Sequence, residues 1–125
     1  MIPIIKILLV CIITIGYSNN PQTINNQFLF CLNADIKPLV ITIDNSKILT
    51  GLKDLDAWIS KNNIKKIEQW LPIAHPNDNS GGIFLNRIYR LTLMENDLQL
   101  IEILRNDLNK FNFIHSTEFE YIRKP

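Results

Sequence analysis

The sequence contains few of the residue types that form disulfides, metal sites or charged binding surfaces. It has two cysteines and two histidines, and its 13 basic and 12 acidic residues leave a formal net charge of +1. So neutral a chain lacks the basic face that nucleic-acid binding requires, because that binding depends on neutralising phosphates. His75 and His115 lie far apart, with no acidic or cysteine cluster beside either. We therefore expect no metal, no cofactor and no nucleic-acid partner.

Catalytic motifs are also missing. The serines, Ser116 among them, lie in neither a Gly-x-Ser-x-Gly nor a Gly-Thr-Ser context, the surroundings typical of an activated nucleophile. Glu118 and Glu120 share one side of a predicted strand, which we interpret as a solvated face and not as a glycosidase pair. Trp58 and Trp70 are interpreted as core or core-edge residues. The chain is predicted not to be an enzyme, although a longer precursor containing it could be a serine endopeptidase.

The N-terminal residues 1–18 have the pattern of a signal peptide. Met1 to Lys6 carries one positive charge, Ile7 to Ile15 is apolar, and Gly16 and Ser18 place small residues where a signal peptidase reads them. The apolar run is shorter than the roughly twenty residues of a spanning helix. We predict cleavage between Ser18 and Asn19, contact with the membrane only during export, and a secreted or periplasmic protein. The alternatives are an uncleaved anchor and a buried helix at the start of the chain.

Processing would leave Cys31 as the only cysteine, so no internal disulfide could form. The remaining chain of roughly a hundred residues suffices for one hydrophobic core and not for two. The fold is therefore expected to depend on apolar packing alone.

The first half of this domain predicts a leader, two strands and a helix. Residues 19–27 are polar and Asn-rich, which indicates a disordered leader before a domain over 28–122. Apolar runs over 28–33 and 38–43, split by a turn, predict strands. Leu52, Leu55 and Ile59 then follow a helical period, with Thr50 as the expected N-cap and Asn62-Asn63 as the end.

The second half predicts strand, loop, strand, helix and strand. Residues 65–73 indicate a strand, and the Gly-, Asn- and Pro-rich residues 74–82 indicate an exposed hairpin loop. The clearest strand is 83–94, where Tyr89, Leu91 and Leu93 alternate with polar residues. A helix capped by Asn96 reaches Phe111, followed by a strand over 113–122 and the start of a linker at 123–125.

This element order predicts an α+β fold. Strand, helix, strand, strand, helix, strand is the ferredoxin-like βαββαβ open sandwich, an antiparallel sheet with two helices on one face. No element remains to cover the opposite face, and an exposed apolar face there would need a partner. The predicted core comprises Leu55, Ile59, Tyr89, Leu91, Leu93, Ile101, Leu104 and Leu108.

The C-terminal third, in the segments 87–93, 96–111 and 114–122, resembles a known family. It is similar to the propeptide (inhibitor I9-like) domain that precedes the catalytic domain of bacterial subtilisin-like serine proteases. The Arg87-to-Leu93 strand and the helix end at Leu108-Asn109-Lys110-Phe111 fit the family pattern. So do Ile114, Glu118, Tyr121 and Ile122 of the last strand. Thr117 and Phe119 depart from it, where alanine and proline are usual.

The resemblance implies an inhibitor and intramolecular chaperone of a secreted subtilisin-like serine protease, acting in cis or in trans. The open sheet face would dock on helices of the protease, while the end of the chain lies across the substrate cleft as an added strand, with Tyr121 in a specificity pocket. The cleft-binding residues would be Phe119, Glu120, Tyr121, Ile122, Arg123 and Lys124. The chain is then a fragment of a longer precursor or a free-standing inhibitor. The alternative is a secreted ferredoxin-like protein-binding module unrelated to proteases.

Overall fold

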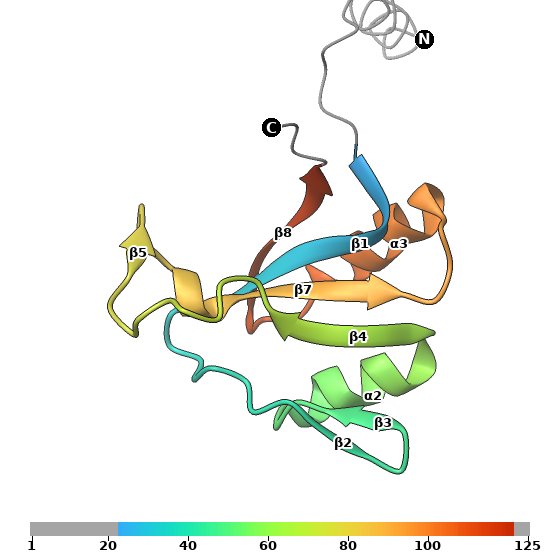
Figure 1. Cartoon of the computed structure of the whole chain (residues 1–125), viewed down its shortest axis with the longest axis horizontal. Coiled ribbons are helices and arrows are strands. Elements are labelled where there is room, and N and C mark those ends of the chain that lie inside the picture. The colour runs from blue at the N-terminus through green and yellow to red at the C-terminus, as the bar shows by residue number, and fades with distance from the viewer. Residues whose placement is uncertain (1–22, 122–125) are drawn as a thin grey trace, which may run out of the picture.

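The computed structural model describes residues 23–121, an α+β fold with a four-stranded antiparallel sheet and two α-helices (Figure 1). The predicted signal peptide, with its cleavage site at Ser18 and Asn19, lies outside the described residues, as do residues 122–125. In chain order the elements are β1 (Thr23–Leu32), β2 (Thr42–Asp44), β3 (Lys47–Leu49), α2 (Lys53–Lys61), β4 (Ile64–Gln69), β5 (Asn79–Ser80), β6 (Ile83–Phe84), the 3-10 helix η1 (Leu85–Arg87), β7 (Ile88–Leu93), α3 (Leu98–Leu108) and β8 (Ile114–Tyr121).

The four longer strands form the main sheet in the order β4-β7-β1-β8. β1 is central and antiparallel to both of its neighbours, with Phe28 opposite Leu91 on β7 and opposite Phe119 on β8. β4 pairs with the other side of β7, so β4 and β8 are the edge strands (Figure 1). Two short hairpins, β2-β3 and β5-β6, lie outside this sheet.

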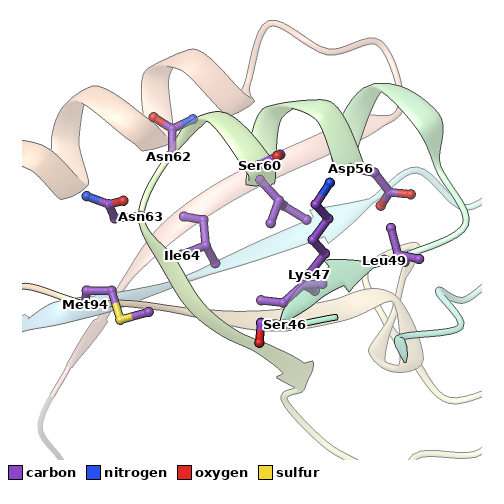
Figure 2. Close-up of a pocket in the computed structure, with 11 residues that line it drawn as sticks. Ser46, Lys47, Leu49, Asp56, Ser60, Asn62, Asn63, Ile64 and Met94 are labelled. Atoms are coloured by element: carbon purple, nitrogen blue, oxygen red, sulfur yellow. The ribbon is translucent and has the colours of Figure 1, made fainter. Parts of the chain in front are cut away.

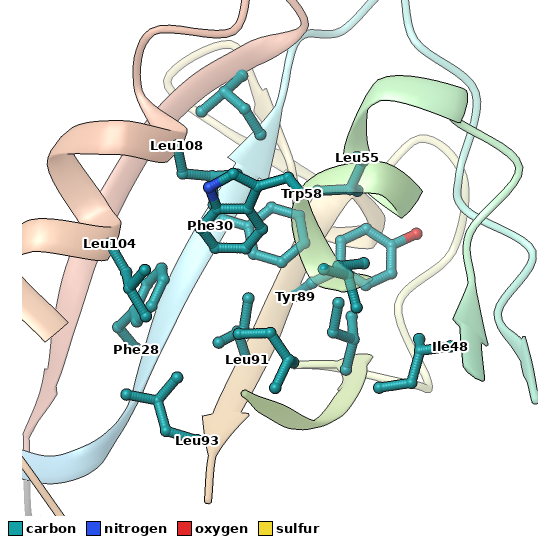
Figure 3. Packing of buried hydrophobic residues seen from close by; sticks show 14 of the residues in the cluster. Phe28, Phe30, Ile48, Leu55, Trp58, Tyr89, Leu91, Leu93, Leu104 and Leu108 are labelled. Carbon is teal, nitrogen blue, oxygen red and sulfur yellow. The ribbon is translucent and has the colours of Figure 1, made fainter. Parts of the chain in front are cut away.

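The core lies between the sheet and the two helices. Alternate residues of β7, namely Tyr89, Leu91 and Leu93, are buried, and the residues between them are not, as a half-buried strand requires. All eight predicted core residues are buried in one cluster, so that prediction is confirmed. Phe28 and Phe30 of β1 join them, and the Phe30 ring stacks on Tyr89 with 5.5 Å between ring centres (Figure 3).

A hydrogen bond between side chains links the two helices across this core. The buried indole of Trp58 on α2 donates from Nε1 to Asp107 Oδ2 on α3 over 2.8 Å. Figure 3 shows the Trp58 ring between the helices, close to Leu108 and Phe30. The bond satisfies the only polar atom of a tryptophan that the core otherwise surrounds, and both helices therefore cover the same sheet face.

The predicted leader, residues 19–27, is wrong for Thr23–Gln27, which belong to β1. The polar composition of this segment indicated disorder, but tertiary partners give its backbone hydrogen bonds. Thr23 pairs with Tyr121 at the end of β8, and Asn25 O accepts a 2.8 Å hydrogen bond from Asp97 N.

The predicted strand over 38–43 is also wrong, because only Thr42–Asp44 form a strand, β2. Residues before it run irregularly past the sheet, and Ile36, Leu39 and Ile41 pack against the core. Their apolar character reflects this packing and not strand pairing. The β2-β3 hairpin turns at Asn45 and Ser46, both with positive φ, as a two-residue hairpin loop requires.

Other boundaries also differ from the sequence expectation, and α3 ends at Leu108, before the predicted end at Phe111. The predicted strand 83–94 is interrupted by η1, where Arg87 Nε donates to Ile36 O over 2.6 Å. β4 ends at Gln69, before the predicted end at residue 73. The helix caps are shifted, because Leu52 is the N-cap residue of α2 and Asp97, not Asn96, caps α3 by accepting from Leu100 N.

Candidate functional site: the helix-free face of the sheet

The sheet face opposite the helices carries the side chains most suited to binding. We call it the helix-free face, and the strand register defines its rows. In one row, Arg90 on β7 lies beside Leu29 on β1, which lies beside Glu118 on β8. Glu68 on β4 lies on the other side of Arg90. The next row contains Ile88, Cys31 and Ser116.

An ion-pair network crosses this face. Arg90 Nε and Nη2 donate to the two carboxylate oxygens of Glu120 over 2.8 and 2.7 Å, a bidentate pair. Gln27 on the intervening strand donates to Glu120 Oε1 over 2.9 Å, and Glu68 Oε2 lies 3.7 Å from Arg90 Nη1. Only 14% of the Glu120 side chain is exposed, so this carboxylate is held within the protein surface and not freely solvated. We call Gln27, Glu68, Arg90 and Glu120 the charge network.

The network stabilises the charged form of the Arg90 guanidinium. Its hydrogen bond with Glu120 raises the pKa of the Arg90 guanidinium, and burial, which acts in the opposite direction, is the smaller cause. Paired charges of this kind bind strand to strand and have no free position for a substrate. The network therefore links all four strands of the main sheet across the helix-free face.

An apolar hollow of about 80 Å³ opens beside the network. It is lined by Leu29, Cys31, Trp70, Ile83 and Ile88, with Ser116 and Glu118 at its polar rim, and Phe30 also contributes. Trp70 follows β4 directly, and its backbone N–H donates to Ile88 O over 3.0 Å, so the indole is positioned next to the sheet. Trp70 and Ile88 are each partly exposed. We call this the apolar hollow.

Cys31 lies at the base of the hollow as a protonated thiol. The side chain is buried, and Sγ lies 3.3 Å from Leu32 O, to which it donates. Burial raises the pKa of the Cys31 thiol, and the nearby carboxylate of Glu118 raises it further. A thiol with these surroundings is a poor nucleophile and acts as a small apolar side chain.

The structure describes three of the six residues predicted to lie in a protease cleft, and all three belong to β8. Phe119 is partly buried on the helix side, with the Arg105 guanidinium 4.2 Å from its ring centre. Glu120 is in the charge network. Tyr121 is the last residue of β8 and is 48% exposed. Ile122, Arg123 and Lys124 lie outside the described residues.

One serine has a neighbourhood that the sequence reasoning missed. His115 Nδ1 lies 3.0 Å from Ser116 Oγ, a hydrogen bond between sequence neighbours on β8. Among the described side chains, no carboxylate bonds to the His115 ring to orient it, which a Ser-His-acid triad requires. The pair is exposed on a strand, and the arrangement contains only one of the two contacts of such a site.

A second hollow, of about 210 Å³, lies between β3, α2 and the start of β4 (Figure 2). Two of its polar side chains, Asp56 and Asn62, are engaged in hydrogen bonds. Asp56 Oδ1 accepts from the backbone N–H and the hydroxyl of Thr50 at 2.7 Å each, and Asn62 Nδ2 donates to Trp58 O. Figure 2 shows Lys47 pointing towards α2 between Ser60 and Asp56. The hydrogen bonds between Thr50 and Asp56 join the segment after β3 to α2.

Within residues 23–121, no group of three or more His, Cys, Asp or Glu side chains could hold a metal ion. No helix in this same range has the length and apolar character needed to cross a membrane.

The sequence indicated part of this site. Glu118 and Glu120 share one side of β8, as predicted, but the interpretation of both as a solvated face is wrong for Glu120. The roles of Arg90 and Trp70 were missed, because a strand's alternation shows which side a residue takes and not which residue lies opposite.

No protein-family model matches the chain, and neither a curated protein nor a solved structure matches it.

Proposed function

We propose that the chain is the propeptide-type domain of a secreted subtilisin-like serine protease, acting as its inhibitor and folding assistant. In this proposal it has the ferredoxin-like fold, follows a signal peptide, and performs no catalysis of its own. The observation that carries the proposal is the sheet itself. Both helices cover one face, and the other presents the apolar hollow and the charge network to a partner.

The strand order supports the ferredoxin-like assignment. When the four strands of the main sheet are numbered along the chain, the sheet reads fourth, first, third, second, with one helix in each of the two strand–helix–strand units. This order agrees with the antiparallel split-βαβ arrangement that the proposal assigns to the chain. The β5-β6 hairpin and η1 are insertions before the third strand.

The chemistry of the helix-free face supports a protein partner. A partly exposed tryptophan beside aliphatic side chains and a polar rim is the composition that protein interfaces favour. Before the precursor is cleaved between propeptide and protease, the protease is tethered to this face and is therefore held at high effective concentration. Binding to the native form of the protease also stabilises that form. This gives one surface both proposed roles, inhibition and assistance in folding.

The competing proposal is a secreted protein-binding module unrelated to proteases. It is favoured by the structural roles of two residues of β8. Phe119 packs under Arg105 and Glu120 binds Arg90, so neither side chain is available to a substrate cleft. Under the propeptide proposal, the cleft-binding segment therefore begins at Tyr121 or later.

Inhibition separates the two proposals. The chain from Asn19 to Pro125 is added at increasing concentration to subtilisin-like proteases, including one from its own genome, and peptide hydrolysis is followed. Inhibition at micromolar concentration or below (about −8 kcal/mol) supports the propeptide proposal. A trypsin-type serine protease is the control and should be unaffected. If every subtilisin-like protease retains full activity, the propeptide proposal is wrong and the binding module replaces it.

A further inference from the structure

The apolar hollow borders the one carboxylate of the helix-free face that has no cationic partner among the described residues. Arg90 is the nearest cation in the same row, but it is committed to Glu120 and Glu68. Lys66 also pairs with Glu68. Glu118 is exposed, lies directly opposite Leu29 in the strand pairing, and forms no ion pair within residues 23–121.

We propose that the helix-free face binds a protein segment in which an apolar side chain lies next to a lysine or arginine. This inference rests on the proposed function as a binding domain and specifies the chemistry of the partner's surface. The apolar side chain enters the hollow beside Trp70, and the cation pairs with Glu118 at its rim.

The size and surroundings of the hollow define the apolar group. Its volume of about 80 Å³ exceeds the ~15 Å³ that one water needs, and it adjoins a wider groove of about 530 Å³ that shares Leu29, Trp70 and Glu118. The hollow accepts an apolar side chain, and the groove gives room for the segment that carries it. Contact with the Trp70 indole and the Leu29 and Ile88 side chains would remove their exposed apolar surface from water, which is the main source of affinity.

The charges of the helix-free face define the second group. Glu68 and Glu120 pair with Lys66 and Arg90 on this face, whereas Glu118 has no ion pair among residues 23–121. An acidic partner segment would meet Glu118 without compensation, and like charges at an interface oppose binding. A cationic residue beside the apolar side chain satisfies Glu118 without disturbing the charge network.

Two synthetic amphipathic peptides test this chemistry without a protease. They are identical except that a lysine beside a central leucine in one is a glutamate in the other. Each is titrated into ¹⁵N-labelled protein from Asn19 to Pro125, and the signals of the Trp70 indole N–H and the Ile88 and Glu118 amides are followed. We expect saturable shifts with the lysine peptide and binding of the glutamate peptide that is weaker by up to about fivefold, the upper end of the range for one exposed ion pair.

Two variants with the same change in charge complete the test. Glu118→Gln should abolish the preference for the lysine peptide, whereas Glu95→Gln, in the exposed turn before α3, should retain it. Equal binding of the two peptides, no shift at Trp70, or a preference that survives Glu118→Gln would overturn the inference. Shifts of the same signals on raising the protein concentration alone would show that a second copy is the occupant, which also overturns it. Because no protease is present, these outcomes are independent of the inhibition assay.

Discussion

Arg90 on β7 and Glu120 on β8 form a bidentate ion pair across the strand that separates them. The pair reaches over Leu29 of β1, which lies beside Arg90 in the strand pairing. It therefore joins three strands of the sheet at one point, with Gln27 contributing a further bond to Glu120. Substitutions at this pair therefore measure how much the ion pair contributes to the stability of the sheet.

Replacing Glu120 by glutamine should lower the free energy of unfolding by about 1–2 kcal/mol. The substitution weakens the charge-assisted hydrogen bonds of Arg90, while Glu68 still compensates part of its charge. Urea unfolding followed by circular dichroism measures the loss. Glu118→Gln on the same strand, without an ion pair, is the matched control and should change stability by less than about 0.5 kcal/mol. Equal effects of the two variants would show that the bidentate pair does not stabilise the sheet.

Leu104 on α3 is buried against the sheet, and Leu104→Ala should cost about 2–5 kcal/mol of stability, because it leaves a cavity in the core. Ile103 is its neighbour on the same helix and is 62% exposed. Ile103→Ala should therefore change stability by less than about 0.5 kcal/mol. Thermal or urea unfolding of the two variants gives the comparison. A loss of stability below about 0.5 kcal/mol for Leu104→Ala would show that Leu104 does not lie on the buried side of α3.

Tyr89 should make the protein sensitive to alkaline pH. Its side chain is fully buried, and Oη accepts from Leu39 N over 2.8 Å. Burial raises the pKa of the Tyr89 phenol above its ordinary value of about 10. The phenol is neutral in both states at neutral pH, but above pH ~10 only the unfolded chain loses the proton readily. The free energy of unfolding should therefore fall as pH rises beyond this value.

Tyr89→Phe separates the contribution of the hydrogen bond to Leu39 from that of phenol ionisation. Near pH 7 it should lower stability by about 1–3 kcal/mol, because the Leu39 N–H loses its acceptor. Above pH ~10 the stability of the variant should fall less steeply than that of the unaltered protein. Urea unfolding at a series of pH values measures both, and parallel pH profiles would contradict the role given to Tyr89.

The proposed inhibitory segment can be separated from β8 by deleting residues 122–125. Tyr121 is kept, because it ends β8 and pairs with Thr23. The deletion should weaken protease inhibition by about tenfold or more (~1.4 kcal/mol) and leave the melting temperature nearly unchanged. Further removal of Tyr121 should lower the melting temperature as well, because it shortens the strand. If the first deletion leaves inhibition intact, the docking surface lies on the domain and not on its C-terminal end.

The signal-peptide prediction specifies which residue becomes the N-terminus on export. N-terminal sequencing of protein secreted from a bacterial host should give Asn19 as the first residue, because Gly16 and Ser18 supply the small residues that the peptidase reads. Protein recovered outside the membrane with Met1 intact would disprove the cleavage site. β1 starts four residues after Asn19, so cleavage at this point leaves the sheet complete.

The amino-acid sequence by itself determined those features that depend on neighbouring residues along the chain. The apolar spacing of Leu55 and Ile59 and of Ile101, Leu104 and Leu108 predicted both helices and their buried sides, and the alternation of Tyr89, Leu91 and Leu93 predicted the core face of β7. These patterns are local, because the geometry of a helix or a strand sets which side chains share a side.

The tertiary structure alone decided which distant residues meet. The polar composition of Thr23–Gln27 predicted a disordered leader. In the structure, β8 and the Asp97 N–H form hydrogen bonds with the backbone of this segment. Alternation placed Arg90 and Glu120 on strands, but only the register across β1 brings the two together and leaves Glu118 unpaired beside the apolar hollow. A strand's sequence shows which side a residue takes, whereas its partner depends on strand order and register, which long-range packing selects.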